Sequence, residues 1–318
     1  MIRRLLLARL PSRGMACIRW PTYGRYFSDK ASQTDESSQS KVNKLIGELR
    51  QSTEPFSGDV HEPDIPADQY KAIQKYQKEL RELMKMGEMA SAFEVCMQVI
   101  DLVCQYYPKS HPVSLSCFNN LAILLRKNGQ YTEAKAIQVS VYEGYCQLFG
   151  DLHRHSLVAL KNLSSMMIAS GEVDRAVKTL REIIDKVEQV TDSDMSDIKY
   201  LCHSELASSL RELGDIDAAL KCHETAESLV KQLYPNNNEV ILARLGISKG
   251  MTYKRAGNTR AAEKIYTDSL SVLESHYPPH HPEIVATCHN LATLYQETND
   301  TENAEIYLEK VLNALKDK

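Results

Sequence analysis

Cysteine and histidine stand next to each other at three places in this 318-residue sequence, and together they offer the donor atoms of a zinc site. The pairs are Cys202-His203, Cys222-His223 and Cys288-His289. All three lie in stretches of helical periodicity, where neighbouring residues point to different faces and cannot hold one ion. We therefore interpret the eight cysteines as reduced, small, buried side chains and expect no metal and no other cofactor.

Motifs of enzyme chemistry are missing from the sequence. It contains no glycine-rich phosphate loop, no H-E-x-x-H metal motif and no nucleophile elbow. His111, His153 and His281 recur at related positions between helical segments, which indicates loop or capping roles better than catalytic bases. We expect a protein that binds without catalysis, and an enzyme is the least favoured alternative.

The composition favours a helical globular chain. Apolar residues make up 43% and charged residues 25%, while glycine and proline are few, at 13 and 11. No apolar run approaches the ~20 residues needed to span a bilayer.

The first 27 residues form a basic leader. They contain six arginines, and the first acidic residue is Asp29. This charge asymmetry resembles a mitochondrial presequence, and Arg25-Tyr26-Phe27-Ser28 resembles the cleavage pattern of the matrix protease, which would cut after Phe27. Removal of the leader lowers the formal net charge from −4 to −10. We expect import into the mitochondrial matrix.

Two other interpretations of the leader stay open. A secretory signal would have only Leu5 to Ala8 as its apolar segment before Arg9, which is too short, and an ordinary cytosolic tail is the third possibility. Residues 28–65 are rich in Ser, Asp, Glu, Gln and Pro and predict a flexible polar linker, with a short helix over 44–50.

A six-fold repeat follows over residues 66–318. Glycine stands at 87, 129, 171, 214 and 257, with Asn299 in the sixth place, so the spacing is 42 or 43 residues. Alanine always stands five residues after the turn residue, and a small residue usually stands seven before it. Each glycine ends a first helix in the left-handed conformation, and the small residues let a second helix approach closely. The pattern predicts helical hairpins that bury their apolar faces by stacking on their neighbours.

The repeat resembles the tetratricopeptide pattern, lengthened as in kinesin light chains. His111-Pro112 and His281-Pro282 match the H-P motif of those proteins, and Asn290-Leu291-Ala292 follows as it does there. Residues 149–153 resemble their G-x-x-H linker, although Arg154 replaces the proline. The resemblance covers about residues 66–316 and implies an all-α, right-handed superhelical solenoid of six hairpins.

In such solenoids the first helix of each hairpin lines a concave groove. The resemblance therefore implies which positions face a partner, counted back from each turn residue. These positions hold Lys78, Arg81, Lys85, Asn119, Asn120, Arg126, Lys127, Lys161, Asn162, Ser165, Ser204, Ser208, Arg211, Arg244, Ser248, Lys254, Arg255, His289, Asn290 and Gln296.

Ten of these groove positions are Lys or Arg, whereas only Glu205, Glu212 and Glu297 are acidic. Arginine suits carboxylates, and asparagine can hold the backbone of an extended peptide. We expect an acidic extended segment of a protein partner, although solvated helix faces are the simpler reading of the same charges. Nucleic acid is less favoured, because the body is acidic and the groove positions offer no stacking aromatic residues.

The function predicted from sequence is a protein-interaction scaffold or assembly factor in mitochondria. The alternatives are a cytosolic cargo adaptor of kinesin light chain type and an RNA- or ribosome-associated organellar factor. The array ends at about Leu315 without a polar capping helix, so Val311, Leu312 and Leu315 are expected at an open edge that could carry self-association.

Overall fold

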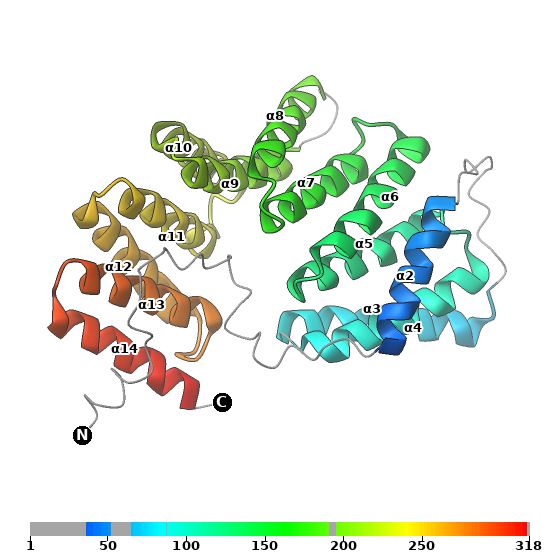
Figure 1. Cartoon of the computed structure of the whole chain (residues 1–318), viewed down its shortest axis with the longest axis horizontal. Helices are drawn as coiled ribbons and strands as arrows, with labels where there is room; N and C mark the ends of the chain where they lie inside the picture. The colour runs from blue at the N-terminus through cyan, green and yellow to red at the C-terminus, as the bar shows by residue number, and fades with distance from the viewer. Residues whose placement is uncertain (1–35, 52–64, 87, 191–194, 317–318) are drawn as a thin grey trace. The chain divides into compact units, whose positions relative to one another are not determined.

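The computed structural model describes residues 36–51, 65–86, 88–190 and 195–316, and the predicted leader at 1–27 lies outside them. The described part of the chain is all α, with thirteen helices and no strand (Figure 1). None of its helices combines the length and the apolar character that crossing a membrane requires.

Twelve of the described helices pair into six antiparallel hairpins, in agreement with the six sequence repeats. Each hairpin packs on the next, as in a solenoid. The hairpins are α3 (Ala67–Met86) with α4 (Met89–Tyr106), α5 (Pro112–Lys127) with α6 (Tyr131–Phe149), α7 (Arg154–Ala169) with α8 (Val173–Gln189), α9 (Ser196–Leu213) with α10 (Ile216–Leu233), α11 (Glu239–Arg255) with α12 (Thr259–His276), and α13 (Pro282–Glu297) with α14 (Thr301–Lys316).

The predicted left-handed residue is present in the five hairpins whose turn residue is described. Gly214 ends α9 with φ 88° and ψ 3°, a conformation that costs glycine least. Asn299 takes the same place in the last hairpin with φ 60°, and it is the one residue besides glycine with positive φ in the described chain. Gly87 lies outside the described residues.

Small side chains stand where the two helices of a hairpin cross. Ala122 of α5 and Ala134 of α6 are both fully buried, and these are the positions seven before and five after the turn residue. A larger side chain at either position would push the helix axes apart. The predicted alanine column is buried in every repeat: Ala92, Ala134, Ala176, Ala219, Ala262 and Ala304.

Helix α2 (Glu36–Gln51) lies before the hairpins and corrects the prediction of a flexible linker over this part of 28–65. It is also longer than the expected helix at 44–50. Its apolar residues Val42, Leu45 and Leu49 are buried in the same core as the first two hairpins, and α2 packs on α6. The spacing of Val42, Leu45 and Leu49 carried the helical signal, which the polar composition of the segment concealed.

The last helix differs in part from the expected open edge. Val311 is buried against the core of the last two hairpins, so it does not belong to an exposed surface. Leu312 and Ile306 are exposed, at 42% and 48%. The side chain of Leu315 lies outside the described ones.

Gly250 of α11 offers a test of the close crossing. A Cβ placed there would lie 2.7 Å from the ring of Tyr266, which is fully buried and cannot move aside. A Cβ at Gly47 of α2 would meet nothing within 4 Å. Both Gly→Ala changes gain helix propensity, so the clash is the difference between them. We expect Gly250→Ala to be less stable than Gly47→Ala by about 1–3 kcal/mol in chemical denaturation.

Equal unfolding free energies for the two variants would show that α11 and α12 can separate without cost. Circular dichroism before the titration checks that both variants keep the helical content of the parent chain.

Candidate functional site

The first helices of successive hairpins lie beside one another and are joined by polar contacts. Helix α5 contacts α7, α7 contacts α9, and α9 contacts α11. We call the surface that these first helices share the first-helix face. The bonds across it link residues about one repeat apart, which shows that the predicted groove positions of neighbouring hairpins come together.

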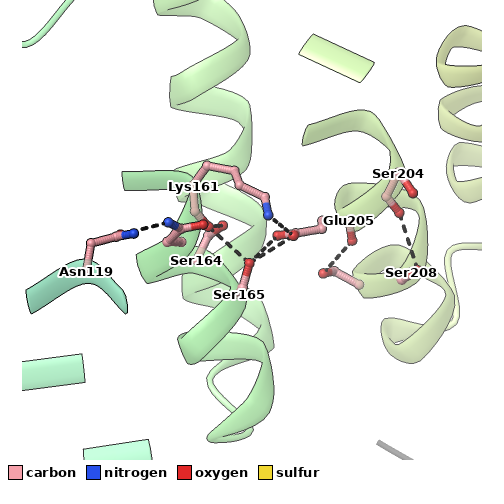
Figure 2. Close-up of polar contacts among 9 residues, drawn as sticks. Asn119, Lys161, Ser164, Ser165, Ser204, Glu205 and Ser208 are labelled. Carbon is pink, nitrogen blue, oxygen red and sulfur yellow. Dashed lines mark hydrogen bonds and ion pairs between the residues drawn. The ribbon is translucent and has the colours of Figure 1, made fainter. Parts of the chain in front are cut away.

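Glu205 of α9 is the centre of the contacts in Figure 2. The ammonium of Lys161 lies 2.6 Å from its carboxylate, and the Ser165 hydroxyl donates to it at 2.8 Å. The Lys161 side chain is only 17% exposed and that of Glu205 25% exposed. Both charges are therefore used largely within the protein, and Lys161 is not a freely available cation for a partner.

Three amide side chains connect α5, α6 and α7. The Asn119 side-chain oxygen accepts a hydrogen bond from Asn162 at 2.9 Å and one from Gln138 at 3.1 Å. Gln138 is fully buried and also donates to the Ala159 carbonyl at 3.0 Å. These bonds fix the orientation of Asn119, whereas Asn120 beside it has no described bond within the hairpins.

Gln138 was missed by the sequence reasoning, and so was the buried pair of His223 with Thr252, whose side chains lie 3.0 Å apart. Gln138 and His223 share one position, nine residues after the turn glycine. The other four repeats have an apolar residue at this position. A polar residue there was therefore the sequence signal that could have identified Gln138 and His223. Burial lowers the pKa of His223 to about 3, so its ring is neutral.

Arg211 is a buried residue rather than a groove cation. It is 8% exposed, and its guanidinium donates to the Ser248 carbonyl of α11 at 3.2 Å. The hydroxyls of Ser208 and Ser248 are 3.1 Å apart beside it. Burial lowers the pKa of Arg211 from its usual value, and the neighbouring Arg255 acts in the same direction. The hydrogen bonds of Arg211 and Ser208 to Ser248 link α9 to α11.

Two more predicted groove cations form ion pairs between hairpins. Arg244 lies 2.8 Å from Glu283 in the first turn of α13, and Lys254 lies 3.0 Å from Glu297. Arg154, which replaces the proline of the family motif, makes an equivalent bond to Asp197 at 3.0 Å. An acid in the first turn also complements the helix dipole. The first-helix face is therefore less positive than a count of its Lys and Arg residues indicates.

Five predicted cations have no ion pair within the described chain: the exposed Lys78 and Arg81 on α3, and three more on α5 and α11. Arg126 and Lys127 in the last turn of α5, and Arg255 in the last turn of α11, have no ion pair within the described chain. Arg126 is half-buried, while Lys127 and Arg255 are exposed. Partial burial, and then repulsion from Arg126, lower the pKa of Lys127. The other predicted residues, Asn120, Ser204, His289 and Asn290, are half-buried, and the side chain of Lys85 is not among the described ones.

The linker histidines cap helices, as predicted from their recurrence between helical segments. His111 Nδ1 accepts the Val113 N–H at 3.2 Å and starts α5. His281 Nδ1 accepts the Glu283 N–H at 3.3 Å, and its ring stacks on Tyr277 with centroids 4.0 Å apart. His153 does the same at the start of α7, next to Phe149. A nitrogen that accepts a bond must be unprotonated, so these caps need neutral imidazole.

Four of the cysteines in the described ranges are buried. Cys96, Cys117, Cys202 and Cys288 are buried, and burial raises the pKa of Cys117 and Cys202 to about 12, which makes them unreactive. In the part of the chain that the structure covers, no three His, Cys, Asp or Glu side chains are placed to share a metal ion.

Comparison with known sequences identifies the repeat. Two tetratricopeptide repeat profiles match the chain, one over residues 114–155 and the other over residues 245–317. These spans correspond to the second hairpin and to most of the last two, so the chain contains tetratricopeptide repeats. A search of curated proteins gave no match.

Comparison with solved structures supports the same fold. A Podosopora anserina protein described as a kinesin light chain with nearly identical TPR-like repeats has a TM-score of 0.50 at 18% identity, covering 64% of this chain and 95% of that one. BtubC of P. vanneervenii has a TM-score of 0.52 at 16% identity, with 76% and 93% covered. Aspartyl phosphate phosphatase F of Bacillus subtilis has a TM-score of 0.58 at 15% identity, with 92% and 68% covered. At these identities the likeness concerns the fold alone.

The His281 cap gives a pH prediction. Burial, with Arg244 and His280 nearby, lowers the pKa of His281 below 6.5, although Glu283 acts against this. A depressed folded pKa means that the stability is present above pH 6.5 and is lost as the pH falls through the lower folded value. Asparagine caps a helix but does not titrate in this pH range. We therefore expect the His281→Asn variant to lose less stability than the parent chain between pH 7 and pH 5, as measured by thermal unfolding.

The difference between the two proteins isolates His281, because the other histidines titrate in both. An equal loss in both would mean that the imidazole does not cap α13 in solution.

Proposed function

We propose that this protein is a non-catalytic scaffold of mitochondria that holds an acidic, extended segment of a protein partner against its first-helix face. The tetratricopeptide fold supports a protein partner in general, since stacked hairpins present one long continuous surface. The acidic character of the segment and the mitochondrial compartment are separate proposals.

The proposal of an acidic segment rests on one observation. The side chains of Arg126, Lys127 and Arg255 have no ion pair within the described chain. Of the other predicted cations from α5 to α13, Lys161, Arg244 and Lys254 are neutralised by glutamates of the next hairpin, and Arg211 is buried. Cations without an internal acid partner on an otherwise acidic protein attract carboxylates, and arginine can bind them with two parallel bonds. We assign the contacts to the segment's acids to these three residues.

An extended backbone needs hydrogen bonds as well as charge. Asn120 and Asn290 are half-buried and have no described side-chain partner within the hairpins, so their amides could pair with a peptide group. Asn119 and Asn162 serve the contact between α5 and α7 instead. The segment would therefore meet Asn120 and Arg126 on α5, and Arg255 and Asn290 on the last two hairpins.

The mitochondrial compartment is proposed from the leader alone. Six arginines without an acid in 27 residues suit the import machinery and the membrane potential. The acidity of the remaining chain has a consequence for binding, because it makes the three available cations stand out against their surroundings.

Reversal of two available charges tests the acidic segment. We expect Arg126→Glu with Arg255→Glu to lower partner capture at least about tenfold, since two attractive contacts become repulsive. Tagged full-length protein is crosslinked mildly in cells and its partners are quantified by mass spectrometry. The matched control is Lys178→Glu with Lys264→Glu, which makes the same charge change on exposed positions of the second helices α8 and α12.

Equal loss in both variants would indicate a general effect of charge, and equal capture by the parent and the Arg126/Arg255 variant would remove the first-helix face from partner binding.

The compartment is tested by sequencing the N-terminus of the protein isolated from fractionated cells. We expect a mature chain that begins at Ser28 and is found in mitochondria. An intact N-terminus on a cytosolic protein with motor or vesicle partners would contradict import and favour a cargo adaptor. Recovery with RNA that is lost on nuclease treatment would favour an organellar RNA-associated factor.

A further inference from the structure

Helix α2 is the one described helix that belongs to no hairpin. It lies along α6, and its contacts with the other described helices are few compared with those inside a hairpin (Figure 1). Every other helix in the described ranges packs against the other member of its hairpin. Residues 52–64 connect α2 to the array, so its position depends on its own side chains rather than on a short loop.

One apolar stripe attaches α2 to the array. Val42 is fully buried, and Leu45 and Leu49 are 7% and 8% exposed, one and two turns further along the same face. They join a core that includes Ile137 and Val141 of α6. The surface beneath α2 is therefore apolar and shaped to receive a helix with residues at positions i, i+3 and i+7.

Polar contacts at the two ends set the direction of α2. Near its start, the Gln39 amide donates to Glu133 at 3.1 Å and bonds Gln130, both at the start of α6. Near its end, Glu48 lies 2.5 Å from the Lys109 ammonium in the loop between α4 and α5. The hydrogen bond from Lys109 lowers the pKa of the Glu48 carboxyl, which is ionised at neutral pH. The side chains of this ion pair are 28% and 38% exposed, so water reaches it.

We propose that the α6 surface under α2 is a binding site for an amphipathic helix, that α2 is its resident occupant, and that a partner helix replaces it. The partner carries apolar residues at i, i+3 and i+7, an amide near its N-terminus and a carboxylate near its C-terminus. The site is separate from the first-helix face, and its occupancy does not depend on the acidic segment proposed above.

Competition between α2 and a partner helix follows from the tether. Covalent attachment gives α2 an effective concentration on the order of millimolar at this surface. A free helix at micromolar concentration therefore binds only weakly until α2 is weakened or held elsewhere. Release of α2 exposes an apolar surface on the second hairpin without opening any hairpin turn.

A labelled peptide of residues 36–51 is the probe, and it is titrated into the full-length chain with fluorescence anisotropy as the readout. The Leu45→Asp variant puts a charge in the middle of the apolar stripe and should release its own α2. We expect this variant to bind the peptide at least tenfold more tightly than the parent chain. Asn43→Asp adds the same charge on the exposed face of α2 and should behave like the parent chain.

A peptide that itself carries Leu45→Asp should bind none of the proteins. Peptide binding by Leu45→Asp that is no tighter than by the parent chain, or equal binding of the altered peptide, overturns the proposal.

Hydrogen exchange of the unmodified chain gives an answer that does not depend on a variant. A releasable helix should exchange its α2 amides at least tenfold faster than the amides of α6. Equal protection of α2 and α6 would show that α2 leaves only when the array unfolds, and this outcome also overturns the proposal.

Discussion

The close crossing of two helices just after a left-handed turn is the contact on which the rest of this structure depends. The alanine on the second helix is buried in all six hairpins, and the small residue on the first helix is buried in the five hairpins that have one. This short distance lets the longer apolar side chains on either side interdigitate, which provides most of the burial. It also fixes the angle of each hairpin, and hence the face that the hairpin offers to the next one.

Regular hairpins bring their first helices into register, and the register creates the polar contacts between repeats. Lys161 with Glu205, Arg244 with Glu283 and Lys254 with Glu297 each join neighbouring hairpins. Such pairs add little stability where they are exposed, but they decide which charges remain available to a partner. From α5 to α13, these pairs and the burial of Arg211 leave Arg126, Lys127 and Arg255, which are the proposed binding residues.

Helix α2 lies outside the repeat period but packs on the array. The second helices of hairpins are apolar on the side that faces their neighbours, and α2 covers such a surface on α6 with only three fully packed side chains. Unlike a hairpin helix, α2 has no antiparallel partner within the described chain. Exchange with a partner helix then requires the loss of one stripe of contacts and one half-exposed ion pair.

The sequence by itself determined the period, the left-handed turn residues, the alanine column, the number of hairpins and the capping role of His111, His153 and His281. All of these follow from local helical geometry, because they depend on residues within one hairpin. Tertiary structure decided that Arg211 is buried, that Lys161, Arg244 and Lys254 are neutralised, and that Gln138 and His223 form buried links. It also decided that α2 packs on α6. Each of these facts depends on the rotation of one element against another, and no spacing along a single helix encodes that rotation.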